Sequence, residues 1–209
     1  MGFLTTEKGK AYWTYAFTPD TKYKAEGEYK IKLRMSGQEA IDLQKYVDDL
    51  YDQSLAEAVD DSPAKKISKA NNSVYTECLN EDGAPTGELE FTFKQRAVIT
   101  KKDKTTMPMR VAVFDAKGEP ITEEVVVGNG STVKVSYEPF KWVTPTMGAG
   151  VTLRFKALQV IKLMSRAGGD KAEGFGFGEE DGYSHDNNNN NSDDNDEFLP
   201  ETSDQDEDF

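Results

Sequence analysis

The sequence predicts a mainly β fold, an antiparallel barrel or sandwich with one amphipathic α-helix, followed by a disordered acidic tail. Short segments of alternating apolar and polar residues run through most of the chain, which is typical of strands with one buried face. Regular helices do not separate them, so a parallel βαβ sheet is not expected. Only one segment has helical spacing, and after Met164 apolar residues become sparse.

The first two predicted strands carry aromatic and basic side chains. In "AYWTYAF", residues 11–17, alternation predicts that Trp13, Tyr15 and Phe17 face the same way. In "EYKIKLRM", residues 28–35, apolar side chains share one face and cations share the other. Those cations are Lys30, Lys32 and Arg34.

One amphipathic helix is predicted over residues 38–59. Its apolar side chains, among them Val47 and Leu50, recur with helical spacing. Ser36 and Glu39 have the spacing of a capping box, which favours a helix start here. Residues 38–61 contain eight acidic residues and a single base, Lys45, so the outer face of the helix is expected to be acidic.

The remaining strands are expected after the helix, with "DAKGEP" and "GNGS" as turns between some of them. In the last strand, Arg154 and Lys156 share one face, while Leu153 and Phe155 share the other. The chain therefore contains six or seven predicted strands. The later ones are "ELEFTFKQRAVI" (88–99), "RVAVF" (110–114), "EEVVV" (123–127), "STVKVSY" (131–137) and "GAGVTLRFKALQVIKL" (148–163).

Charge divides the chain into two parts, a domain over residues 1–167 and a tail over residues 168–209. The 209 residues carry a net charge of -13, yet residues 170–209 alone hold fifteen acids and one base. Residues 1–169 hold 24 bases and 23 acids, so the body is nearly neutral. A tail of this composition buries too little apolar area to fold. No apolar run is long enough to span a bilayer, and a single cysteine, Cys78, excludes an internal disulfide. An intracellular protein is expected.

Catalytic and metal-binding patterns are weak, so neither an enzyme nor a cofactor is expected. The one histidine, His185, lies in the tail, and no phosphate-binding loop or G-x-S-x-G motif occurs. The run from Asp186 to Glu197 matches the ligand spacing of a calcium loop, but Asn191 stands where such loops need glycine. This run is interpreted as a polar tether, and calcium binding stays an open alternative.

Basic and aromatic residues that share strands favour nucleic-acid binding. A groove for single strands needs cations for the phosphates and aromatic faces for the unpaired bases. The segment "SYEPFKW", residues 136–142, supplies Phe140, Lys141 and Trp142 in addition to the residues of the first two strands. The tail alone would instead favour a protein-interaction module, such as a DNA mimic or a chaperone for basic proteins.

Several motifs in order resemble the single-stranded DNA-binding proteins of T-seven-like bacteriophages. They are the D-x-K-G turn at 115–118, the glycine-rich turn before a K-V strand, P-aromatic-K-W at 139–142 and G-A-x-V-x-L from Gly148. The resemblance covers most of residues 11–165, and the tail matches in being long, acidic and Phe-terminated. It implies an OB-fold, a Greek-key barrel with one helix. It also implies sequence-independent binding of single-stranded DNA in replication, recombination and repair, in the host bacterial cytoplasm.

The resemblance also implies site residues. In the family, an aromatic residue of the P-aromatic-K-W motif and lysines of the preceding strand contribute to DNA binding, which corresponds here to Phe140, Trp142 and Lys134. The sequence departs from the family at Ser136, where a second lysine is usual, and in a shorter connection to the proline. The full set of candidate DNA-binding residues is Trp13, Tyr15, Lys30, Lys32, Arg34, Lys134, Phe140, Lys141, Trp142, Arg154 and Lys156.

The end of the tail is the candidate partner-binding segment, with Asp206, Glu207, Asp208 and Phe209 as its residues. The resemblance implies that a phage DNA polymerase and a primase-helicase are its partners. Without DNA, the acidic tail is expected to occupy the basic groove. An RNA-binding OB domain and a homodimer both remain open.

Overall fold

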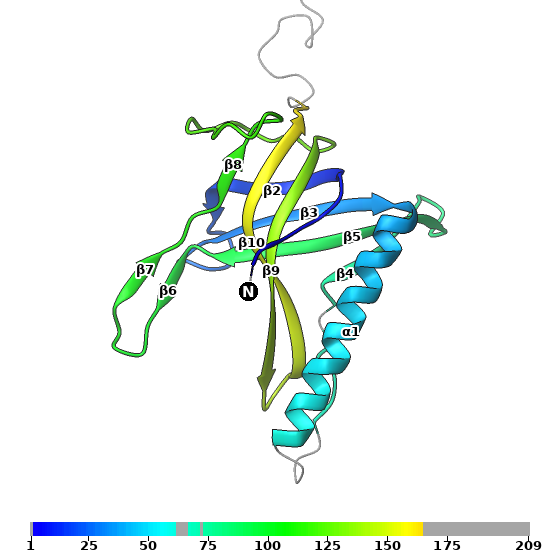
Figure 1. Cartoon of the computed structure of the whole chain (residues 1–209), viewed down its shortest axis with the longest axis vertical. Helices are drawn as coiled ribbons and strands as arrows, with labels where there is room; N and C mark the ends of the chain where they lie inside the picture. The colour runs from blue at the N-terminus through cyan, green and yellow to red at the C-terminus, as the bar shows by residue number, and fades with distance from the viewer. Residues whose placement is uncertain (1, 62–66, 72, 165–209) are drawn as a thin grey trace, which may run out of the picture.

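The computed structural model describes residues 2–61, 67–71 and 73–164, so the tail and all predictions made for it lie outside the described residues. Within these ranges the elements follow one another as a strand-rich chain with one long helix (Figure 1). They are β1 (Leu4–Thr5), β2 (Gly9–Asp20), β3 (Glu28–Ser36), α1 (Gly37–Asp61), β4 (Tyr75–Leu79), β5 (Pro85–Arg96), β6 (Val98–Thr100), β7 (Thr106–Pro108), β8 (Ala112–Phe114), β9 (Thr132–Thr144) and β10 (Gly148–Lys162).

Five of the strands close a barrel in the order β2, β3, β5, β10, β9 and back to β2. Neighbouring strands are antiparallel except β5 and β10, which pair in parallel through Leu153 with Phe93 and Arg154 with Lys94. Strand β8 also pairs in parallel with β10, while β1 and β4 pair with β9 and β5. This is a five-stranded Greek-key barrel of the OB type, so the predicted fold class is confirmed.

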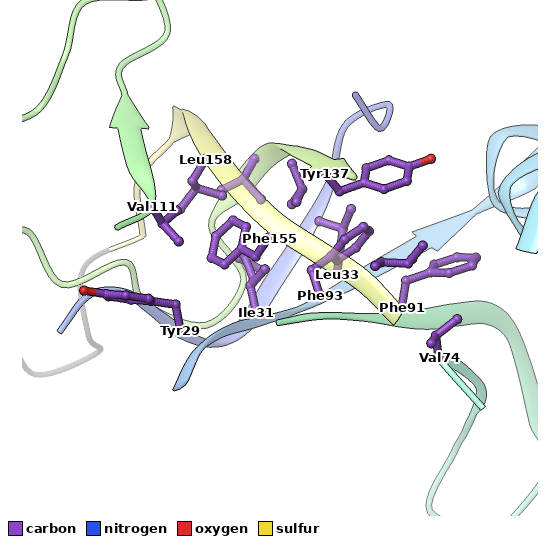
Figure 2. Close-up of a cluster of buried hydrophobic side chains, with 14 of the residues drawn as sticks. Tyr29, Ile31, Leu33, Val74, Phe91, Phe93, Val111, Tyr137, Phe155 and Leu158 are labelled. Atoms are coloured by element: carbon purple, nitrogen blue, oxygen red, sulfur yellow. The ribbon is translucent and has the colours of Figure 1, made fainter. Parts of the chain in front are cut away.

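The barrel interior is filled by the inward faces of β3, β5, β9 and β10 (Figure 2). Phe91, Phe93 and Phe155 are fully buried there, as their alternation with polar residues predicts. The ring of Phe93 packs against that of Tyr137, with 5.3 Å between ring centroids. Burial raises the pKa of Tyr137 to about 12. Because inward and outward positions alternate along β3 and along β5 from Phe91 to Arg96, the core fixes which side chains these segments show to solvent.

The helix predicted over residues 38–59 is confirmed as α1, which packs on β9 and β10 and runs beside their extended hairpin (Figure 1). The hydroxyl of Ser54 donates a hydrogen bond to the carbonyl oxygen of Gly150, at 3.2 Å. Gly148 has φ +86°, and a Cβ there would lie 2.1 Å from the carbonyl oxygen of Ser68. Only glycine fits this approach between the hairpin turn and the chain that follows α1.

One predicted strand is wrong. Residues 123–127, "EEVVV", form no strand but cross from β8 to β9 as irregular chain. Val127 is buried while Val126 is exposed, and no described strand pairs with this segment through its backbone. Valine favours strands only where a neighbouring strand and a packed face exist, which explains the failure.

Within the described ranges, no helix is long and apolar enough to cross a membrane.

Candidate nucleic-acid interface

Three cations lie side by side on the outer surface of the barrel. Lys30 on β3 pairs directly with Lys94 on β5, and Lys94 pairs with Arg154 on β10. Partners in register point to the same side of a sheet, so Lys30, Lys94 and Arg154 form a row across three strands, here called the cationic row. Like charges directly opposite one another are destabilising. A row of this kind is therefore suited to bind an anion that lies across the strands.

The described carboxylates neutralise the cationic row only at its ends. Asp20 forms an ion pair with Lys30, and Glu138 lies 3.7 Å from Arg154 and 2.9 Å from Lys156. The hydrogen bond from Lys30 lowers the pKa of Asp20, and that from Lys156 lowers the pKa of Glu138. Lys94, at the centre, forms no ion pair with a described carboxylate. The cations at both ends remain partly exposed, Lys30 at 30% and Arg154 at 36%, so a phosphate can reach them and compete with the carboxylates.

Next to the cationic row, one carboxylate holds two further cations of β3. Glu90 is buried and accepts hydrogen bonds from Lys32 Nζ at 2.7 Å and Arg34 Nε at 2.8 Å. Burial alone would raise the pKa of Glu90, but these two hydrogen bonds outweigh it and the pKa is lowered. Two cations share one negative charge, so this arrangement keeps a net positive charge and fixes the positions of both side chains.

Aromatic rings from β2 lie beneath the cations of β3. The guanidinium of Arg34 lies 4.1 Å from the ring centroid of Tyr12, and Lys30 Nζ lies 5.0 Å from that of Tyr15. Tyr12 is opposite Lys32 and Tyr15 is opposite Lys30, so three steps on β2 match two on β3. The extra residue is a β-bulge, and it brings both tyrosines to the outer surface.

The predicted alternation of β2 is wrong because of this bulge. Trp13, Tyr15 and Phe17 do not share one face, because Phe17 packs partly against the core. Trp13 lies in the bulge with φ +50° and is 61% exposed, and its backbone N–H donates to the side-chain oxygen of Asn129 at 3.0 Å. The bulge therefore leaves the indole of Trp13 largely exposed to solvent.

Two aromatic residues of β9 lie on the same outer surface but in different environments. The guanidinium of Arg154 stacks 3.5 Å from the ring centroid of Phe140, which remains 41% exposed. Trp142 is half-buried, and its indole N–H donates to Thr152 Oγ1 at 3.0 Å. A Cβ at Gly150 would lie 2.3 Å from the indole, so the ring rests directly on this glycine. Phe140 can stack on a base, while Trp142 is fixed against β10.

The two remaining candidate lysines of β9 have different positions. Lys141 alternates with Phe140 and Trp142 and forms an ion pair with Glu57 of α1, on the opposite side of β9 from the cationic row. The structure thus does not bring Lys141 together with the other candidates. Lys134 is on the same side of β9 as Phe140, and its Nζ lies 3.7 Å from Glu7.

The structure adds three residues that the sequence interpretation missed: Lys94, Tyr12 and Phe3. Lys94 follows from the alternation of "LEFTFK", residues 89–94, in which every second residue is apolar, so a signal for it was present. The outward position of Tyr12 depends on the bulge, which alternation does not predict. The ring centroid of Phe3 lies 5.7 Å from Lys156 Nζ, a tertiary contact that the sequence does not reveal. The outer surface that these elements form is called the cationic face. Its members are Phe3, Tyr12, Tyr15, Lys30, Lys32, Arg34, Lys94, Phe140, Arg154 and Lys156.

Among the described residues, no group of three His, Cys, Asp or Glu side chains is arranged to hold a metal ion. The predicted calcium spacing at 186–197 and the partner-binding segment at 206–209 lie outside the described residues.

Sequence comparison relates the chain to one family. The family model described as "Single-stranded DNA-binding protein, Bacteriophage T7" matches residues 9–163. A single-stranded DNA-binding protein of Enterobacteria phage T3 is 36% identical over 137 residues, which cover 62% of this chain and 56% of that protein. Its counterpart in Escherichia phage T7 is 35% identical over 94 residues, covering 44% of this chain and 38% of that protein. The matched region thus spans about half the length of these relatives or less.

Structural comparison agrees on the fold. The crystal structure of a single-stranded DNA-binding protein encoded by bacteriophage T7 has a TM-score of 0.67 and 22% identity, covering 88% of this chain and 99% of that chain. The single-stranded DNA-binding protein of bacteriophage Enc34 in complex with single-stranded DNA has a TM-score of 0.54 and 13% identity, covering 78% of this chain and 88% of that chain. At these identities the two structures support the fold alone.

Proposed function

Because the chain belongs to the family of single-stranded DNA-binding proteins described for bacteriophage T7, we propose that it binds single-stranded DNA without sequence preference through its cationic face. The observation that carries the proposal is the cationic row, in which Lys30, Lys94 and Arg154 lie in register with only its ends neutralised by described carboxylates. Phosphates replace Asp20 and Glu138 as the partners of these cations.

The bases stack on aromatic rings while the cations hold the phosphates. Tyr15 and Phe140 have a cation on one side of the ring and remain accessible to solvent. Base–aromatic stacking stabilises the bound strand by about 1–3 kcal/mol per base and does not depend on base identity. The protein therefore acts by stoichiometric coating: it protects unwound strands, melts weak hairpins and promotes annealing, with no turnover.

Salt titration of binding to oligo-dT tests this mechanism. Each phosphate contact with single-stranded DNA contributes about 0.7 to the slope with which log affinity falls as log salt concentration rises. If three phosphates contact the cationic row, the slope should therefore be at least about 2. Phe140→Ala should weaken binding by about 5- to 150-fold, the equivalent of one lost stack, and leave the salt slope unchanged. Val143→Ala, another exposed position on β9, is the matched control. Affinity that is insensitive to salt would exclude the phosphate mechanism.

We further propose roles in phage DNA replication, recombination and repair, with a division between residues 1–167 as the DNA-binding domain and 168–209 as a regulatory tail. The tail's charge supports this, because fifteen acids over forty residues roughly imitate a phosphate backbone. Bound DNA displaces the tail and frees Phe209 for the phage polymerase or primase-helicase in the bacterial cytoplasm. A homodimer is compatible with this scheme.

Truncation after residue 167 separates the two proposed roles of the tail. We expect tighter binding to oligo-dT, because a competing polyanion is removed, and loss of binding to polymerase and primase-helicase. Phe209→Ala should keep the electrostatic competition and lose most of the partner contact. Gel shifts and pull-downs with the full-length chain as reference measure both effects. If truncation removes DNA binding, the tail is the active part and the protein is an interaction module. Competition between matched DNA and RNA oligomers distinguishes DNA from RNA as the ligand.

A further inference from the structure

The β6–β7 hairpin projects from the barrel and adds nothing to its core (Figure 1). Val98 pairs with Pro108 and Thr100 with Thr106, as a two-stranded sheet separate from the main one. No residue from 98 to 109 is buried. Two-stranded hairpins are marginally stable in water unless something else packs against them. Because the hairpin does not stabilise the core, its role is expected to be a contact with another molecule.

The tip of the hairpin carries three lysines, and the acidic residue between them, Asp103, is hydrogen-bonded to Thr105. The Asp103 carboxylate accepts hydrogen bonds from the Thr105 N–H at 3.0 Å and the Thr105 hydroxyl at 2.6 Å. These bonds lower the pKa of Asp103 and fix the turn. None of the tip lysines forms an ion pair with a described carboxylate. The tip lysines are Lys101, Lys102 and Lys104.

The backbone of Lys104 is in a conformation that lysine rarely adopts. Its φ is +66°, in the left-handed region where Gly and Asn are usual, and its N–H donates to the carbonyl oxygen of Lys101 at 3.0 Å. Strained residues of this kind persist only where the surrounding structure holds them, and they cluster at ligand-binding sites. A third cation therefore stands at a turn position that suits glycine, which adds to the positive charge of the tip.

The hairpin starts at the end of the cationic face, next to a second basic loop. The N–H of Ala97 bonds to the carbonyl oxygen of Gly27 at 3.0 Å, and Arg96 pairs with Glu28, two residues beyond Lys94. The loop between β2 and β3, residues 21–27, carries Lys22 and the 81% exposed Tyr23. Lys22 Nζ lies 5.4 Å from the Tyr23 ring centroid, which repeats the pairing of cation and ring found on the cationic face.

We propose that the β6–β7 hairpin is a second phosphate-binding element, which holds single-stranded DNA as it leaves the cationic face past the loop at 21–27. This inference rests on the proposed function and extends its footprint. A strand confined to the cationic face does not reach the hairpin tip, while a longer strand does. The hairpin lysines therefore contribute only to the binding of longer strands.

Binding to two lengths of oligo-dT tests the hairpin. The lengths are about four and about sixteen nucleotides, the limits of the footprint of one OB-fold. For Lys101→Gln with Lys102→Gln in the full chain, we expect more than tenfold weaker binding of the long oligomer at about 0.1 M salt, with a salt slope lower by about 1.4. Binding of the short oligomer should not change. Lys45→Gln with Lys117→Gln removes the same charge from exposed positions off the cationic face and should alter neither.

A second variant separates charge from turn geometry. Lys104→Gly keeps the left-handed turn, removes its strain and removes one cation, so thermal stability should be unchanged or higher while long-oligomer binding weakens. Equal weakening for both lengths, or no weakening for either, would show that the hairpin is not a separate phosphate site. If the unaltered protein binds neither oligomer in a salt-dependent way, the proposed function itself fails.

Discussion

Replacing Lys94 with glutamate should weaken binding to oligo-dT by about 100-fold at about 0.1 M salt, because three phosphate contacts are lost together. The new carboxylate would lie in register between Lys30 and Arg154 and would form ion pairs with both. The same change should raise the midpoint of thermal unfolding, since repulsion between like charges on adjacent strands is replaced by attraction. Fluorescence titration and a thermal melt of the same preparation measure the two effects.

The opposite signs of these two effects identify their cause. A variant that binds weakly because it is misfolded would also melt earlier. Lys117→Glu makes the same charge change in the exposed turn before Gly118 and should leave affinity within about twofold, because it is off the cationic face. If Lys94→Glu binds as tightly as the unaltered protein, the cationic row is not the phosphate site.

Replacing the preceding residue, Phe93, with alanine should instead reduce the free energy of unfolding by about 3–5 kcal/mol. Phe93 is fully buried, packs against Tyr137 and pairs in register with Leu153 across the parallel junction between β5 and β10. The strands of a closed barrel cannot move inward to fill the cavity that the lost ring leaves. The loss of unfolding free energy should therefore lie at the upper end of the range for core substitutions. Urea unfolding followed by circular dichroism measures it.

Phe3→Ala is the matched control for the core substitution. Phe3 is 64% exposed, so its loss should change stability by less than about 0.5 kcal/mol. A cost below about 1 kcal/mol for Phe93→Ala would mean that the barrel can repack around the missing ring. Phe93 and Lys94 are adjacent on one strand, so the two substitutions would show that one neighbour stabilises the fold while the other binds DNA.

Alternation along β3 and β5 predicted which side chains of these strands face the core and which face outward. Ile31 and Leu33 face the core while Lys30 and Lys32 face outward, since both strands pair regularly over their whole shared length. The same pattern was sufficient to indicate Lys94. In such strands the physical information is local, because a one-residue shift would expose every apolar side chain at once.

Strand β2 could not be predicted in this way. Its bulge is set by the pairing of Tyr12 with Lys32 and Tyr15 with Lys30, and those partners lie on another strand. Lys141 shows the same limit: its alternation with Phe140 was visible, but its ion pair with Glu57 depends on where α1 packs. The site therefore follows from sequence where one strand determines it, and not where tertiary contacts do.

The closure of the barrel also has a consequence for the timing of synthesis. Lys10, at the start of β2, hydrogen-bonds through its side chain to Thr132 of β9, 122 residues later. At the usual rate of translation, roughly 6 to 25 seconds separate the synthesis of the two. During that interval β2 and β3 can pair with each other, but the seam between β2 and β9 stays open until β9 has emerged. The ribosome, rather than the search for contacts, sets the earliest moment at which a closed barrel can exist.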